Sequence, residues 1–497
     1  MPISTPSDQR FDFGLPGSME GGVINLMNSL LPAADLTAEQ IAATQALVSG
    51  AGKIIADGVA LYDVTTTNST TCTIGSASAS FSAADIGKVC ALVPYTDTQL
   101  IAGTAGAWGT ITAVASANQC TAVVSLAPGV LANAIFVYGT DNKTILDDLL
   151  TTAAAVPTKG HVYLPAGIIC SAGSHTVPSG VLLHGAGNNT TGGSAKDFKH
   201  YGTSLVCCKY SATGAFIAMG SFGTSDPRGA AMEYLNVDSM CMTPRCIDGS
   251  ISGRTERLFA VTAVRSSSGS TLQVGPTGRA MLCHVLHNNV SDACGVSGDG
   301  KVLDCLVIGA LAGRAKIAIS NPTDVLVSRN HVWSSAGVTT ASYGIRVSFN
   351  GGVTNSGCCT ISDNEIDTTF SHAYYIAASA ASAGRAVSIT GGHVFNNDSV
   401  PNNSGSVLGI SVASGCSIRG IIFKNVVGMS SFNNPTLGQW ANLVDNSATA
   451  GNIYGFSTGG CVVQGCNAMY SAIIPDVDDV NITMAANGTV LTKSTRI

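Results

Sequence analysis

The sequence predicts an all-β protein whose larger part is a solenoid of parallel strands, a parallel β-helix. Short β-branched segments return roughly every 20 to 35 residues in the second half of the chain, and one loose apolar hexamer recurs with them. Charged residues make up only 11% of the 497 residues, so much surface must be buried within the chain or between subunits. A β-sandwich also uses many short strands, but it does not predict one recurring hexamer.

The N-terminal segment, residues 1–62, is expected to contain a short amphipathic helix. Thr37 stands as N-cap with Gln40 three residues later, a capping-box spacing, and Gly50 ends the apolar stripe. Such an element must pack on a partner, so it serves attachment, oligomerisation or capping of the next domain. The stretch "MPISTPSDQRFDFGLPG" has neither a basic n-region nor an apolar h-region, so no secretory signal is expected.

Residues 63–140 are predicted to form a small all-β module, because alternating segments such as "GTITAVAS" are separated by turn residues. Residues 98–140 carry no charge, yet Gly, Pro and polar residues interrupt them. A spanning helix needs about 20 consecutive apolar residues, so membrane insertion is not expected. The net charge of −6 and the lack of a basic run argue against nucleic-acid binding.

The sixteen cysteines are diluted over a long chain and are expected to be mostly buried free thiols. The "CC" pairs and "GCVVQGC" lack the paired spacing of a zinc site. Neither a metal nor a cofactor is therefore expected.

Residues 141–470 are predicted to form the solenoid, with a helix at about 143–155 and first strands in "HVYLPAG" and "GVLLHGAG". A further strand is expected before most hexamer copies, as in "AKIAI" and "YGIRV". Solenoids need caps, and residues 471–497 are expected to be a C-terminal cap or trimer tail. The hexamer copies begin at Val285, Leu303, Val327, Ile361, Ile389, Ile418 and Val463.

Two stretches resemble known families. "TDNKTILDDLL…GHVYLPAG…VPSGVLLHGAG" resembles the first segment of pectate-lyase-like right-handed β-helix proteins, in which a helix caps the solenoid. "ASFSAADIGKVCALV…GTITAVASANQCTAVVSL" resembles the β module that precedes the β-helix in bacteriophage tailspikes and minor tail proteins. The resemblance implies a right-handed β-helix in a homotrimeric virion protein. Such a protein is assembled in the host cytoplasm, attached to other tail or baseplate proteins through its N-terminus, and directed at a host surface polysaccharide.

Many proteins of this kind cleave that polysaccharide as lyases or glycoside hydrolases, and others only bind it. The expected function is therefore that of a tailspike depolymerase. One alternative is a non-enzymatic virion spike or fibre with the same fold. A second is a bacterial pectate-lyase-like enzyme unconnected with virions.

Three asparagines, Asn288, Asn330 and Asn364, are expected to share one column of the repeat, with Gly392 next. Stacked amides can satisfy each other and the backbone from rung to rung. These side chains are therefore predicted to be structural.

The stretch "CTISDNEIDTT" supplies the first candidate site. If Ile366 points into the core, its two neighbours point outward. Rungs about 4.8 Å apart then align two columns whose carboxylates, imidazoles and aromatic rings suit glycan cleavage. Polar residues on any outward face can also be merely solvated. The predicted catalytic residues are Glu365, Asp367 and His331, and the predicted substrate-binding residues are Trp333, His393 and Phe395.

A second candidate cluster consists of Asp292, Asp304 and His287. With Asp299, His284, Arg279 and Arg314 nearby, it could serve a lyase, in which a cation neutralises a uronate and a base removes the adjacent proton. Two further carboxylates compete in the early rungs, Glu233 and Asp238.

Overall fold

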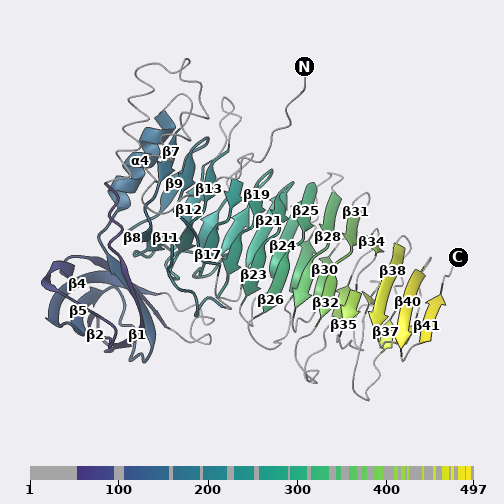
Figure 1. Ribbon diagram of the computed structural model, residues 1–497, viewed down its shortest axis with the longest axis horizontal. Coiled ribbons are helices and arrows are strands. Elements are labelled where there is room, and N and C mark those ends of the chain that lie inside the picture. Colours follow the sequence, from purple (N-terminus) through teal and green to yellow (C-terminus); the bar gives the residue numbers. More distant parts are fainter. Residues whose placement is uncertain are drawn as a thin grey trace, which may run out of the picture.

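The computed structural model describes a barrel followed by a long solenoid (Figure 1). It describes residues 53–94, 106–155, 160–190, 194–220, 229–250, 257–288, 291–309, 315–334, 343–348, 358–367, 372–377 and 386–395, and beyond these the strands β33 to β41. The helix expected around residues 37–50 and the candidate Arg314 lie outside these residues.

The first domain is a closed antiparallel barrel with the strand order β1-β2-β5-β4-β3-β6. Alternating residues fill its interior, among them Ile74, Phe136 and Tyr138. Gly109 is required where β4 crosses β5, because a Cβ there would lie 1.9 Å from the Val123 carbonyl oxygen. The strands are β1 (Val59–Thr66), β2 (Thr71–Gly75), β3 (Val89–Pro94), β4 (Ala107–Ser116), β5 (Gln119–Val124) and β6 (Ala134–Gly139), with a 3-10 turn η1 (Ala83–Asp85) before β3.

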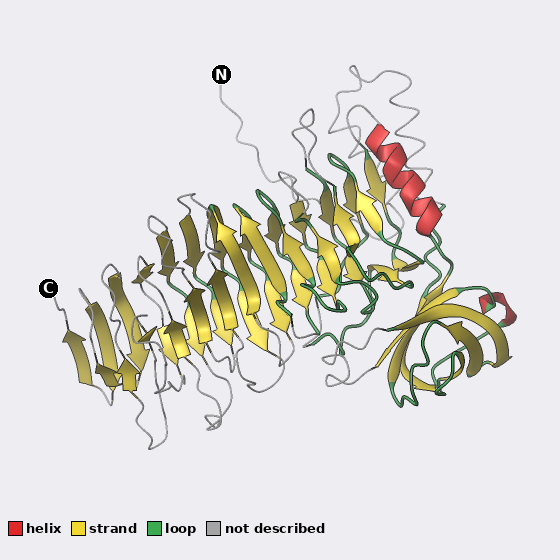
Figure 2. Ribbon diagram, turned by 180° about the vertical axis from the view of Figure 1, so that it is seen from behind, coloured by secondary structure: helices red, strands yellow, loops and turns green. Residues whose placement is uncertain are grey.

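Helix α4 (Lys143–Ala155) follows the barrel and covers the first rung of the solenoid, beside β7 and β9 (Figure 2). Its bounds match the expected helix. Leu146, Leu150 and Ala153 are buried in the solenoid core. Asn142 holds the junction, because its side chain accepts a hydrogen bond from Ile55 N at 2.8 Å and donates to Ile55 O at 2.9 Å.

The solenoid is a parallel β-helix with three strands per rung, which confirms the fold class. The first row contains β7 (His161–Tyr163), β10 (Leu182–His184), β13 (Ala231–Glu233), β16 (Arg257–Phe259), β19 (Arg279–Met281), β22 (Lys301–Leu303), β25 (Asp324–Ser328), β28 (Cys358–Ser362), β31 (Ala386–Thr390) and β34 (Cys416–Arg419). The second contains β8 (Gly167–Ser171), β11 (Thr203–Cys207), β14 (Asn236–Asp238), β17 (Thr262–Val264), β20 (His284–Leu286), β23 (Leu306–Gly309), β26 (His331–Ser334), β29 (Glu365–Asp367), β32 (His393–Phe395) and β35 (Ile422–Lys424).

The third row contains β9 (His175–Val177), β12 (Ala215–Met219), β15 (Arg245–Asp248), β18 (Leu272–Val274), β21 (Cys294–Gly298), β24 (Ala315–Pro322), β27 (Tyr343–Ser348), β30 (His372–Ala377) and β33 (Leu408–Ser411). The expected strands "AKIAI" and "YGIRV" are parts of β24 and β27. Toward the C-terminus lie β36 (Gln439–Trp440), β37 (Asn452–Tyr454), β38 (Val462–Met469), β39 (Ala472–Ile474), β40 (Val480–Ala486) and β41 (Thr489–Lys493).

A two-residue corner joins the first row to the second in the described rungs from β13 to β32. Its first residue has positive φ, and its second points into the core or pairs with the backbone of neighbouring rungs. Positive φ is uncommon outside glycine, so its return in each rung marks a repeated turn. The positive-φ corner residues are Tyr234, Ala260, Leu282, Asp304, Arg329, Asp363 and Gly391.

An asparagine ladder occupies the second corner position in two successive rungs. Asn330 Nδ2 donates to Asn364 Oδ1 at 2.9 Å and to Val302 O at 3.0 Å. Gly392 ends this column with φ of +82°, where a Cβ would lie 2.3 Å from Asn364 O. Asn288 was wrongly placed in the column: it follows β20 at the next corner, where its Oδ1 accepts a hydrogen bond from Ser266 N at 2.8 Å.

The hexamer copies that begin at Val285 and Leu303 were assigned the wrong register. Val285 pairs with Val307, which pairs with Val332, so Val285 matches the last apolar residue of the later copies. Leu303 pairs with Ser328 rather than with Val327, a slip of one residue. The later copies at 327, 361 and 389 are in register. The error arose because the early corners carry apolar residues where the later ones carry Asn.

The solenoid core is continuous and apolar. Ile361 and Ile366, both predicted to be core residues, are 0% and 1% exposed. The described cysteines form no disulfide, and all of them except Cys358 are buried. Their burial agrees with the expectation that cysteine serves here as a small hydrophobic residue.

Candidate functional site

Two columns of residues run along the second row. His331 pairs with Glu365 and Glu365 with His393, while Trp333 pairs with Asp367 and Asp367 with Phe395. The side chains of Glu365 and His393 are exposed, and the intervening Ile366 is buried. The structure therefore confirms the register on which the first candidate site depends. In the preceding rung, Leu306 and Ile308 occupy the columns.

The spacing of these columns suits a sugar-binding surface. Neighbouring rungs lie about 4.8 Å apart, and residues two apart in a strand are separated by about 6.5 Å. Glu365 thus has an imidazole on each side along the solenoid axis, from His331 and His393. An exposed carboxylate between imidazoles can move protons to and from a bound glycosidic oxygen.

The same face is apolar in the rungs before the site. Val264, Leu286 and Ile308 stack in the column that continues to Trp333, and they pack against Ala195 and Phe198. Trp333 is half-buried at the edge of this cluster. Packing holds part of the indole and leaves the rest accessible, an arrangement that favours stacking on a sugar ring.

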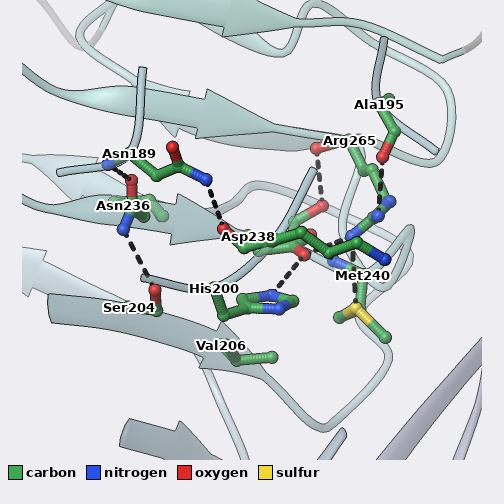
Figure 3. Close-up of polar contacts among 12 residues, drawn as sticks. Asn189, Ala195, His200, Ser204, Val206, Asn236, Asp238, Met240 and Arg265 are labelled. Atoms are coloured by element: carbon green, nitrogen blue, oxygen red, sulfur yellow. Dashed lines mark hydrogen bonds and ion pairs between the residues drawn. The ribbon is translucent and has the colours of Figure 1, made fainter. Parts of the chain in front are cut away.

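Farther back along this column lies a fully buried ion pair. Asp238 contacts Arg265, and its Oδ2 lies 3.0 Å from His200 Nε2, with Asp238, Arg265 and the His200 side chain all 0% exposed (Figure 3). Arg265 Nη2 also donates to Ala195 O at 2.6 Å, and Asp238 Oδ1 accepts from Met240 N at 2.8 Å. Asp238, a competing carboxylate in the sequence, is therefore a structural residue.

Electrostatics fix the protonation of this cluster. Burial alone would raise the pKa of Asp238, but the Arg265 charge and the His200 hydrogen bond outweigh it and hold this pKa below its usual value. Burial lowers the pKa of His200 despite the hydrogen bond to Asp238. The cluster thus contains a carboxylate, a guanidinium and a neutral imidazole at neutral pH.

The buried cluster also attaches the barrel to the solenoid. Tyr62 of β1 places its hydroxyl 2.8 Å from His200 Nδ1 and accepts a hydrogen bond from His200 N at 3.0 Å. Lys199 Nζ lies 3.4 Å from the centre of the Tyr62 ring, a cation–π contact. Burial raises the pKa of Tyr62 to about 12. The sequence did not indicate this cluster, because its members are separated by up to 203 positions (265 − 62) and follow no motif.

A covering segment, described at residues 186–190 and 194–202, lies over the outward face of the first rungs of the second row. Asn189 N donates to Asn236 Oδ1 at 2.7 Å, and Asn236 Nδ2 donates to Ser204 Oγ at 3.0 Å (Figure 3). Thr262 Oγ1 donates to Asn189 O at 2.8 Å. His284, next in this column, is 2% exposed, and burial lowers its pKa to about 4. The face therefore changes from covered to open between His284 and Glu365.

The structure separates Asp304 from His287 in the second candidate cluster. Asp304 lies at the two-residue corner and forms a bidentate pair with Arg329, with both N–O distances 2.7 Å. His287 Nδ1 lies 2.9 Å from Thr271 Oγ1, and Asp292 Oδ2 accepts from Arg346 Nη2 at 2.8 Å. His287 occupies the same position in its rung as residue 309 does in the next rung. Residue 309 follows Asp304 by five positions, which corresponds to about 16 Å of extended chain.

One arrangement has the connectivity of a serine hydrolase triad. His175 Nδ1 lies 2.7 Å from Asp147 Oδ1, and His175 Nε2 lies 2.7 Å from Ser171 Oγ. Ser171 is 0% exposed, however, so no substrate reaches its hydroxyl. Asp147 belongs to α4, and the arrangement ties the capping helix to the first rung.

Among the residues that the structure describes, no group of three or more His, Cys, Asp or Glu side chains could hold a metal ion. In the same part of the chain, no helix is both long and apolar enough to cross a membrane.

Comparison with solved structures finds other β-helix proteins at low similarity. The DFA-IIIase of Arthrobacter chlorophenolicus A6 matches with 15% identity and a TM-score of 0.40, over 70% of this chain and 88% of that chain. A capsular polysaccharide depolymerase, the tailspike protein of Acinetobacter baumannii bacteriophage Fri1, matches with 11% identity and a TM-score of 0.42, over 79% and 71%. The Dettilon tailspike protein matches with 12% identity and a TM-score of 0.36, over 68% and 65%.

No protein-family model matches the chain, and no curated protein matches it. The likeness to these tailspikes and carbohydrate-active enzymes is distant, and at such TM-scores it carries no argument about activity.

Proposed function

We propose that this protein is a phage tailspike that binds a host cell-surface polysaccharide and depolymerises it during adsorption. The observation that carries the proposal is the column of half-buried His331, exposed Glu365 and exposed His393 on the outward face of the second row, beside half-buried Trp333. A flat run of parallel strands offers an extended surface to a polymer, and this column adds groups that transfer protons.

The proposed chemistry is general acid–base cleavage of a glycosidic bond. Glu365 donates or accepts the proton, Asp367 supplies the second carboxylate, and His331 assists proton transfer. Their backbone positions, about 6.5 Å apart for the two acids, allow the carboxyl separations of retaining and of inverting glycosidases. Trp333, His393 and Phe395 hold the sugar rings on either side.

The proposal extends to the assembly. The protein acts as a homotrimer in the virion, assembled in the host cytoplasm and attached to other tail or baseplate proteins through its N-terminal segment. The low charge content and positive mean hydropathy of +0.31 support a buried surface between subunits.

The test is incubation of the purified protein with capsule and lipopolysaccharide from candidate hosts, followed by mass spectrometry of the products. Fragments with saturated ends identify a hydrolase, and unsaturated ends identify a lyase. Binding without fragments from any of these glycans would overturn the enzymatic part and leave a glycan-binding spike.

A further inference from the structure

A ladder of cations lies on the outward face of the first row, away from the Glu365 site. Arg257, Arg279 and Lys301 are register partners on β16, β19 and β22. Their neighbours Leu258 and Ala280 are buried, so the cationic side chains point outward. Arg257 and Arg279 are exposed and Lys301 is partly exposed. Rungs about 4.8 Å apart therefore stack three positive charges in line, which is unfavourable without a counter-charge.

Among the described residues, an acidic partner is found for the first of these cations. Arg257 contacts Glu233, whose second oxygen lies 3.7 Å from His184 Nδ1. The nearby His184 imidazole and the charge of Arg257 hold the pKa of Glu233 below its usual value despite burial.

The other two cations have no acidic partner in the part of the chain that the structure describes. Neither Arg279 nor Lys301 has a carboxylate oxygen within 4.0 Å. Asp299, the nearest acid in sequence, accepts a hydrogen bond from Thr277 N at 2.6 Å. Arg279 and Lys301 thus form no ion pair within the described part of the chain.

A line of rings lies on the same face, in the rungs that precede the cations, and meets them at β16. The centroid separations are 5.3 Å from Tyr163 to His184, 5.4 Å from His184 to Tyr234, and 5.4 Å from Tyr234 to Phe259. These rings are partly exposed, and Met281 continues the column after Phe259. Ring faces suit the apolar sides of sugars, whereas guanidinium and ammonium groups suit carboxylates.

We propose that this face binds an acidic polysaccharide that lies along the solenoid axis, with its rings against the aromatic line and its carboxylates on Arg279 and Lys301. The inference rests on the proposed glycan-directed function and names its substrate class. The cations end two rungs before β28, whose continuation β29 carries Glu365. One bound chain can therefore be held at the ladder and reach the Glu365 site, about 10 Å farther along the axis.

The experiment measures binding of three acidic polymers, polygalacturonate, alginate and hyaluronan, with neutral dextran for comparison. At low salt we expect at least one acidic polymer to bind and dextran to bind more weakly. The double variant Arg279→Glu/Lys301→Glu should bind that polymer about 10-fold more weakly, because two attractive contacts become repulsive. Raising the salt concentration should reduce the difference. The matched control is Lys209→Glu, an exposed cation after β11, which should bind as the unmodified protein does.

Three results would overturn the inference: no preference for any acidic polymer, equal binding by the double variant, or a changed oligomeric mass of that variant. The last would show that the face contacts another subunit. These results are separable from failure of the proposed cleavage. Host glycan cut normally by the double variant contradicts only the cation ladder, whereas charge-dependent binding without cleavage by the unmodified protein contradicts only the catalytic proposal.

Discussion

Glu365 of β29 and His393 of β32 are register partners on adjacent rungs, and both side chains are exposed on the outward face of the solenoid. A buried residue, Ile366, separates Glu365 from Asp367 and fixes the direction in which the carboxylate points. This relationship makes Glu365 the most direct target for mutation.

Glu365→Gln should abolish polysaccharide cleavage, because the amide cannot exchange the proton that acid–base catalysis needs. A loss of at least about 100-fold in rate is expected, measured as fragments released per unit time. The matched control is Asp363→Asn, two residues away at a corner where φ is +55°, a conformation that Asn tolerates. Full activity of the Gln variant would remove Glu365 from the mechanism.

Asp238→Asn should destabilise the protein by about 3–5 kcal/mol, because it leaves the fully buried Arg265 without its counter-charge. Asp304→Asn is the comparison, since it breaks a pair with the exposed Arg329 and should change the stability much less. Denaturant unfolding monitored by circular dichroism measures both. Similar losses in the two variants would contradict the structural role assigned to the buried pair.

Asn330→Ala should destabilise the solenoid by about 2–4 kcal/mol, because it removes the partners of Cys305 N and Val302 O, two buried backbone groups. Thr360→Ala, on the outward face of β28, should change little. If the two variants unfold at the same denaturant concentration, the ladder contributes no stability.

Stability should fall as the pH is lowered from about 6.5 towards 4. Burial lowers the pKa of His175, His200 and His284, in the last case to about 4, so the folded protein binds fewer protons there than the unfolded chain, whose histidines titrate near 6.5. The contribution of these neutral histidines to the free energy of unfolding is fully present above pH 6.5. For His284, complete loss of this contribution amounts to at most about 3 kcal/mol.

Unfolding by denaturant at several pH values tests this expectation. The variant His284→Gln should show a shallower dependence on pH than the unmodified protein, because Gln has no proton to gain. Parallel curves for the two proteins would show that His284 does not contribute.

The strand repeat and the outward columns could be predicted from the sequence, because both follow from periodicity. The register succeeded from Val327 onward, where Asn330 and Asn364 mark the corner, and failed at Val285 and Leu303. In the early rungs the corner residue is apolar, as at Cys283 and Cys305, and nothing local distinguishes it from a strand residue. Periodicity predicts the register of a repeat only where each rung carries the same type of residue at the corner.

The contacts between distant segments could not be predicted. The cluster of Tyr62, His200, Asp238 and Arg265 depends on where the covering segment crosses the solenoid, and that path is not periodic. The separation of Asp304 from His287 has a related cause. Asp304 and His287 are 17 positions apart in sequence (304 − 287), but the rung places them at different corners.

The constant two-residue corner has a consequence for how this chain can be altered. A residue with positive φ recurs at this corner from Tyr234 to Gly391. One extra residue in a corner would turn the side chains of the second-row strand that follows it to the opposite face. Insertions are therefore excluded from this edge of the solenoid. New loops can be accommodated at the other two edges, so variation in loop length and sequence should concentrate at the ends of the third-row strands.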